Sequence, residues 1–84
     1  MKVLVDEKEE GLIKLMGKRV TFFCANYIYT GVLTGVNDTH VMLKDAAIVY
    51  ETGELTSDTW KDAQKLPNDW YIMLSAVESF GLLK

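Results

Sequence analysis

Two glycines interrupt the segment that looks most like a β-strand, and they constrain the fold more than any other feature of the sequence. Residues 27–36 are rich in β-branched and aromatic side chains, with Gly31 and Gly35 inside the run. A glycine within a strand usually marks a bulge or a sharp bend. Two of them in one strand predict a sheet that curls strongly, as a small barrel requires.

Length and charge narrow the class of protein. The chain has 84 residues, 49% hydrophobic, and 9 basic against 12 acidic side chains give a net charge of −3. This fits a single domain, residues 1–84, with a core so small that self-association would add stability. The acidic balance argues against bulk attraction to a polyanion but permits a small local site. With one cysteine and no signal-like or bilayer-spanning run, we expect a cytoplasmic protein with no membrane partner.

Residue periodicity predicts one helix and five strands. Asp6 is a suitable helix N-cap, Leu12 and Leu15 follow at helical spacing, and Gly17 is a natural stop, so we expect a helix over about 6–16. Alternating or β-rich segments predict strands at about 19–25, 27–36, 40–51, 70–74 and 77–81.

The segment between the third and fourth expected strands is irregular and acidic. Residues 52–69 carry no strand pattern and are predicted to be a variable loop, in which Thr59 could begin a single helical turn. Trp60 lies in this loop, and it could anchor a partner protein or pack back onto a neighbouring copy of the chain. We favour packing, because an exposed tryptophan in a polar loop is otherwise hard to explain.

The two C-terminal strands are short and apolar, and only Ser75 and Ala76 separate them. A continuous apolar strand such as 70–74 is normally covered on both faces, and a free apolar edge promotes aggregation. We therefore expect another copy of the chain to cover them, and head-to-tail pairing closes into a ring. The candidate interface residues are Trp70, Ile72, Leu74, Val77 and Phe80.

Four segments resemble the motifs of the Sm/LSm family, which includes bacterial Hfq. Leu15-Met16-Gly17-Lys18-Arg19-Val20 is similar to the family's helix end and first strand, and residues 31–38 are similar to its second strand and turn. Residues 40–45 resemble the third strand of Hfq. Residues 74–80 resemble the tight link and fifth strand of the second Sm motif. The resemblance covers about residues 12–80.

The resemblance implies a fold, an assembly and a ligand. The implied fold is mainly β: an N-terminal α-helix followed by a strongly bent, five-stranded antiparallel β-barrel of the SH3-like type. Family members form rings of five to seven subunits, in which the fourth strand of one subunit pairs with the fifth of the next, and we favour five or six here. Most relatives bind single-stranded RNA around the pore.

Two departures from the family pattern bear on that ligand. His40-Val41 aligns where Sm and LSm members carry a base-binding asparagine. Leu74-Ser75-Ala76 aligns where the second motif usually carries Arg-Gly and Hfq carries Lys-His, so the cationic clamp is absent. Two hypotheses therefore stay open. The first is a ring that binds single-stranded RNA at the pore or rim without catalysis. The second is a homo-oligomeric structural or protein-interaction ring that has lost RNA binding.

Each candidate RNA contact also has a plainer interpretation. Asn37 could hydrogen-bond to a base edge or simply stabilise a turn. His40 could stack on a base or face solvent. Tyr29 could be part of a stacking platform or of the core, and Lys18 and Arg19 could bind phosphate or end a helix. The candidate set is Asn37, Asp38, His40, Tyr29, Ser75, Lys18 and Arg19.

Catalysis and cofactors are not expected. Cys24, His40 and Asp45 could in principle activate a thiolate, but Cys24 shares a strand face with Val20 and Phe22, which is typical of a core residue. One cysteine and one histidine are too few for a zinc site within one chain, and no glycine-rich phosphate loop is present. We expect no enzyme activity, metal, cofactor or small-molecule substrate.

Overall fold

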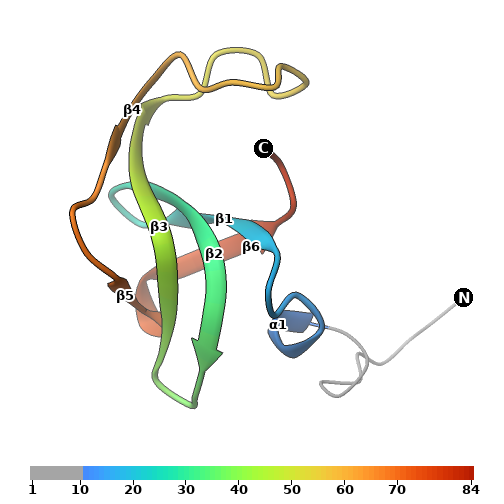
Figure 1. Ribbon diagram of the computed structural model, residues 1–84, viewed down its shortest axis with the longest axis vertical. Helices are drawn as coiled ribbons and strands as arrows, with labels where there is room; N and C mark the ends of the chain where they lie inside the picture. Colours follow the sequence, from blue (N-terminus) through green and yellow to red (C-terminus); the bar gives the residue numbers. More distant parts are fainter. Residues whose placement is uncertain (1–10) are drawn as a thin grey trace, which may run out of the picture.

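The computed structural model describes residues 11–84, and a single antiparallel sheet dominates it (Figure 1). The elements in chain order are α1 (Gly11–Lys14), β1 (Arg19–Cys24), β2 (Ile28–Val36), β3 (His40–Glu51), β4 (Asp62–Lys65), β5 (Trp70–Met73), the 3-10 turn η1 (Leu74–Ala76) and β6 (Val77–Gly81). The expectation of a mainly β, antiparallel protein is confirmed. The sheet has six strands rather than five.

The long strand β3 organises the sheet. One edge of β3 pairs with β2, which pairs with β1, which in turn pairs with β6. The other edge of β3 pairs with β5 over His40–Leu43 and with β4 over Ala47–Glu51. Strands β5 and β6 follow each other in the chain, yet they pair with opposite ends of the sheet and not with each other, so the sheet is not closed.

The sheet bends where the two glycines lie. The β2–β3 register shifts between Thr30 and Val32 and again between Leu33 and Gly35, as the positions of the glycines predict. Opposite Gly31, Asp45 adopts a left-handed φ of 51°. A Cβ on Gly31 would lie 2.9 Å from the Leu43 Cβ and 3.2 Å from the Ala46 Cα. Glycine is therefore required here because the two strands approach too closely for any side chain.

The core is formed by side chains of α1 and of strands β1, β2, β3 and β5. Leu12 anchors the helix to it, and Leu15 packs against it, as the helical spacing predicts. The buried cluster comprises Leu12, Val20, Phe22, Leu33, Val41, Leu43, Ala46 and Ile72. No helix within residues 11–84 is both long and apolar enough to cross a bilayer.

The helix ends earlier than predicted. Of the predicted helix over 6–16, residues 6–10 lie outside the described residues, and α1 ends at Lys14. Two hydrogen bonds that span three residues rather than four follow the helix. The Leu15 N–H donates to the Leu12 carbonyl, and the Met16 N–H donates to the Ile13 carbonyl. Gly17 then takes a φ of 82°, which supports its predicted role as the stop.

The predicted loop over 52–69 contains a strand, which corrects the sequence prediction. β4 pairs Ala63 with Val49 and Lys65 with Ala47, and Asp62 begins this strand rather than continuing a helical turn from Thr59. All four residues of β4 are exposed. Its side chains therefore show no alternation between buried and exposed positions, and only its backbone pairing makes it a strand.

Strand β5 differs from its prediction in burial. The apolar run predicts a strand covered on both faces, but within one chain only Ile72 is buried, at 3% exposure. Trp70, Tyr71 and Met73 are exposed because β5 ends the sheet and no described element covers its outer face or its second edge. Leu74, predicted to be the last residue of this strand, begins η1 instead.

Candidate functional site

Asn37 and His40, two of the candidate RNA contacts, meet in the turn between β2 and β3. The Asn37 Oδ1 accepts hydrogen bonds from the Thr39 N–H at 2.8 Å, the His40 N–H at 2.9 Å and the Thr39 hydroxyl at 3.2 Å. The Asn37 N–H donates to the His40 carbonyl at 3.0 Å. The Asn37 amide oxygen is therefore fully used by the turn, which is the plainer of its two predicted roles.

The imidazole of His40 completes this network. Its Nε2 lies 3.3 Å from the Asn37 Nδ2, and its Nδ1 lies 2.9 Å from the Thr39 hydroxyl. Because the Asn37 amide nitrogen can only donate, this pattern assigns the proton to Nδ1, which donates to Thr39. Both ring nitrogens are engaged in hydrogen bonds within the turn. Another molecule could contact the carbon atoms and the faces of the His40 ring.

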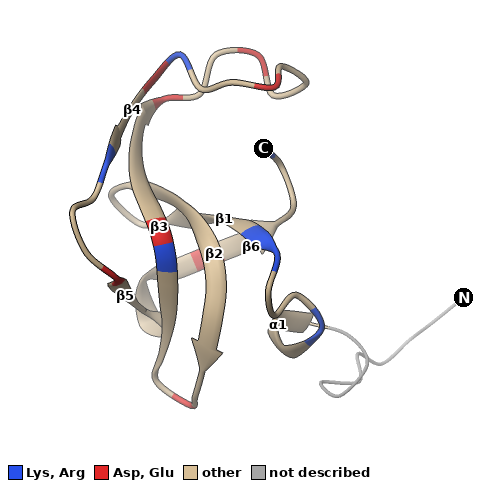
Figure 2. Ribbon diagram, in the orientation of Figure 1, with Lys and Arg blue, Asp and Glu red and all other residues tan. Residues whose placement is uncertain are grey.

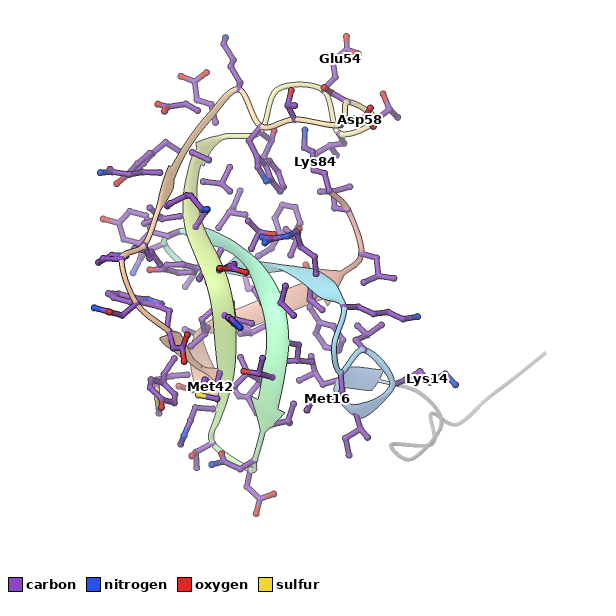
Figure 3. All side chains as sticks on the ribbon, in the orientation of Figure 1. Lys14, Met16, Met42, Glu54, Asp58 and Lys84 are labelled. Carbon is purple, nitrogen blue, oxygen red and sulfur yellow. The ribbon has the colours of Figure 1, made fainter. Side chains whose placement is uncertain are left out.

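Tyr71 of β5 joins His40 at this end of the sheet. The two rings meet edge to face, with centroids 5.6 Å apart and an interplanar angle of 75°. They border a hollow of about 230 Å³, and its lining residues, none of them charged, are Gly35, Val36, Asn37, His40, Met42 and Tyr71. Met42 lies on β3 above the turn (Figure 3). The arrangement can receive a flat, uncharged ring by stacking or edge contacts.

Asp38 lies in this turn and Ser75 lies in η1 beside it, and both are exposed. Asp38 lines a neighbouring hollow with Leu12 and Leu74. The Leu74 N–H donates to the Thr39 carbonyl at 2.9 Å, which ties the turn η1, and with it Ser75, to the tip of the β2–β3 hairpin.

The remaining RNA candidates lie on other parts of the sheet. Tyr29 meets Tyr27 edge to face, with centroids 6.4 Å apart, beside β5 in a hollow of about 180 Å³. Lys18 and Arg19 are exposed at the start of β1, where the Arg19 guanidinium donates to the Asp45 carbonyl at 3.2 Å. Figure 2 shows Lys and Arg on several separate elements of the ribbon. Arg19 lines a hollow together with three lysines and three aspartates: Lys61, Lys65, Lys84, Asp45, Asp58 and Asp62.

Sequence reasoning missed Tyr71. The apolar run that contains it favours a covered strand, so the pattern gives Tyr71 no functional role. What brings it to His40 is the pairing of β5 with β3, in which His40 faces Met73 and Met42 faces Tyr71. The register between β3 and β5 is set by their backbone pairing, and no sequence pattern near Tyr71 indicates that it lies beside His40.

Cys24 does not lie in a site that would activate a thiol. It is half-buried against the core, and its nearest polar contact is the Phe22 carbonyl at 3.9 Å. Burial, reinforced by the negative charge of Glu78, raises the pKa of the Cys24 thiol. Among the described residues no hydrogen bond joins it to His40 or Asp45. Residues 11–84 also contain no cluster of three or more metal-ligating side chains.

The five interface candidates divide into exposed and buried residues. Trp70 and Phe80 are 38% and 40% exposed, whereas Ile72 lies in the core of its own chain. Leu74 and Val77 are partly buried against that core. Trp70 and Phe80 are thus available to another molecule, while substitution of Ile72 tests folding rather than assembly.

In the comparisons with known proteins, no protein-family model and no curated protein matches this chain.

Proposed function

We propose that the protein is a non-catalytic, ring-forming protein whose copies join through β5 of one subunit and β6 of the next. The observation that carries this proposal is that, within the described residues, β5 and β6 each have an unpaired edge and carry large apolar side chains, whereas the third unpaired edge belongs to the short strand β4, Asp62–Lys65. β5 pairs only with β3, and β6 pairs only with β1, among residues 11–84. Because the two edges belong to different strands, their pairing is head-to-tail, and repetition closes into a ring when the rotation between subunits is a whole fraction of a turn.

The side chains at these edges support the same assembly. Tyr71 and Met73 of β5 are 59% and 52% exposed, and Trp70 and Phe80 are also solvent-exposed. Exposed backbone edges flanked by large apolar side chains promote pairing with another chain. The family resemblance of residues 74–80 implies the same strand pairing.

A matched pair of substitutions tests the assembly. Met73 and Tyr50 are almost equally exposed, at 52% and 53%, and both lie on strands, but only Met73 lies on a proposed contact strand. We expect Met73→Glu to dissociate the ring in sedimentation velocity, because a charge cannot be buried there unpaired. Tyr50→Glu should leave the ring intact. Equal behaviour of the two variants would refute the proposed contact.

We propose single-stranded RNA as the ligand of this ring. The hollow bordered by His40 and Tyr71 would recur once per subunit and offers ring surfaces for stacking an unpaired base. Since the Asn37 amide is engaged in its turn, the expected binding mode is stacking with little base-edge reading. Lys18 and Arg19, both exposed, are the candidate phosphate contacts.

Fluorescence anisotropy with a labelled oligouridine tests this ligand. We expect binding at low salt that weakens as salt rises, and a weakening of about 1–3 kcal/mol for Tyr71→Ala, the range for loss of one stacked base. His40→Ala should act in the same direction. Tyr50→Ala is the control, because Tyr50 is 53% exposed, against 59% for Tyr71, but is not among the residues lining this hollow.

The alternative is a structural or protein-interaction ring without RNA. It is supported by the absence of lysine and arginine among the residues that line the hollow bordered by His40 and Tyr71. Under this alternative the ring forms, but oligouridine gives no anisotropy change at low salt. Because Tyr71 lies on β5, sedimentation velocity of Tyr71→Ala must first show that its ring is intact, and assembly and RNA binding can then fail separately.

A further inference from the structure

The side chain of Lys84 ends in a site made by a loop far from it in the sequence. Its ammonium group lies 2.8 Å from the Thr52 carbonyl oxygen, 2.8 Å from the Glu54 carbonyl oxygen and 2.9 Å from the Thr59 carbonyl oxygen. The same nitrogen lies 4.5 Å from the centroid of the Trp60 ring. In Figure 3 Lys84 points toward the loop that carries Glu54 and Asp58.

These four contacts match the chemistry of a primary ammonium group. Such a group has three N–H donors and no acceptor, and the site offers three carbonyl oxygens at hydrogen-bond distance. Hydrogen bonds from a charged donor are stronger than neutral ones, and the face of an indole attracts a cation. A trimethylated or quaternary ammonium could use the Trp60 ring but not the three carbonyls.

The loop itself holds these carbonyls in place. Thr52, Glu54 and Thr59 lie outside the strands, so the sheet does not use their carbonyl oxygens. Gly53 has a φ of 68°, a conformation that other residues rarely adopt, and it turns the chain between the first two carbonyls. The Ser57 N–H donates to the Glu54 carbonyl at 3.1 Å, which closes the turn on the far side.

The site carries charges of both signs and is connected to the sheet, since Lys61 and Lys65 line the adjoining hollow as Asp58 does. Glu54 and Asp58 are exposed on the loop, and Figure 2 shows acidic residues gathered there. Trp60 and Lys84 also line a hollow of about 520 Å³ together with Thr30 and Ala47 of the sheet. The contact thus joins the C-terminal segment to the loop over one face of the sheet.

We propose that residues 52–60 form a binding site for a primary ammonium group, and that the Lys84 side chain is its resident ligand. This contact orders the loop. Removal of the Lys84 amine opens the site, which then accepts a small primary alkylammonium ion. This proposal does not rest on ring formation or on RNA binding.

A first experiment uses the unmodified chain. Lys84 and Lys44 are compared in reaction with a limiting amount of an amine-acetylating reagent, with mass spectrometry to locate the modification. Lys44 is exposed on β3 and provides the reference. We expect Lys84 to react about tenfold more slowly, the factor that one charge-assisted hydrogen bond would produce. Equal rates would overturn the proposal.

A second experiment removes the amine and returns it as a free ion. Hydrogen–deuterium exchange of residues 52–60 is followed in Lys84→Met and Lys84→Ala, with residues 28–49 as the internal check that the sheet is folded. We expect faster exchange in both variants. n-Propylammonium chloride, which supplies the atoms deleted by the alanine substitution, should restore protection in Lys84→Ala. It should not do so in Lys84→Met, whose side chain fills the space.

Tetramethylammonium and sodium chloride at equal ionic strength are the controls, because neither can donate hydrogen bonds to the three carbonyls. Their failure to restore protection supports the proposal. Restoration by tetramethylammonium equal to that by n-propylammonium would overturn it, since charge and the Trp60 face would then be sufficient. Unchanged exchange in Lys84→Met would also overturn it.

Discussion

The close approach at Gly31 gives the sharpest stability prediction. An alanine Cβ at this position would lie 2.9 Å from the Leu43 Cβ and 3.2 Å from the Ala46 Cα, and Ala46 contributes a backbone atom that cannot rotate away. Overpacking of a core typically costs about 1–3 kcal/mol, while replacing glycine by alanine returns about 0.4–1 kcal/mol through the unfolded chain. We expect Gly31→Ala to lower the free energy of unfolding by about 1–2 kcal/mol.

Thermal unfolding followed by circular dichroism measures this effect. For a domain of this size, a loss of about 1–2 kcal/mol lowers Tm by roughly 5–15 °C. Protein concentration must be held constant, because self-association makes Tm concentration-dependent. Gly35→Ala is the matched control: its Cβ would lie 3.6 Å from the Met42 Cβ, which is ordinary contact. A Gly31→Ala variant as stable as Gly35→Ala would refute the argument from close approach.

Three further predictions concern buried polar atoms, the thiol and the hairpin turn. Thr21 and Thr30 are buried, and their hydroxyls have no hydrogen-bond partner among residues 11–84. Thr21→Val and Thr30→Val should therefore each raise the free energy of unfolding by about 1 kcal/mol, measured by urea titration. A decrease in the free energy of unfolding would contradict this. Because burial raises the pKa of Cys24, its thiolate forms only at higher pH than in a free cysteine. The Cys24 thiol should therefore react more slowly than glutathione with a disulfide reagent at pH 8. The raised pKa also means that the folded state binds the thiol proton more tightly than the unfolded state does, and the stability gained from this is lost as pH rises through the raised pKa. Asn37→Ala should cost about 1–2 kcal/mol in urea, and Asn37→Asp, which keeps the accepting oxygen, should cost less.

The strands with strong side-chain patterns could be predicted from the sequence. The predicted bounds 40–51 and 77–81 coincide with β3 and β6, because β-rich or alternating side chains report a half-buried strand directly. The bends at Gly31 and Gly35 were also predictable, since a missing side chain inside a strand indicates a close approach or a bulge.

The features that depend on pairing could not be predicted in this way. β4 has four exposed residues and becomes a strand only because the second half of β3 offers it an edge. The pairing of β5 with β3 brings Tyr71 to His40, and the fold carries Lys84 to carbonyls 25 to 32 residues away. Such contacts depend on register and chain path, which local composition does not encode.

The mass of the protein in solution tests the central claim most directly. Multi-angle light scattering on the unmodified chain at micromolar concentration should give a single species of five to seven times the mass of one 84-residue chain, because the proposed assembly pairs the free edges of β5 and β6 between copies. A stable, soluble monomer at the same concentration would contradict the account, since both edges would then remain unpaired in water.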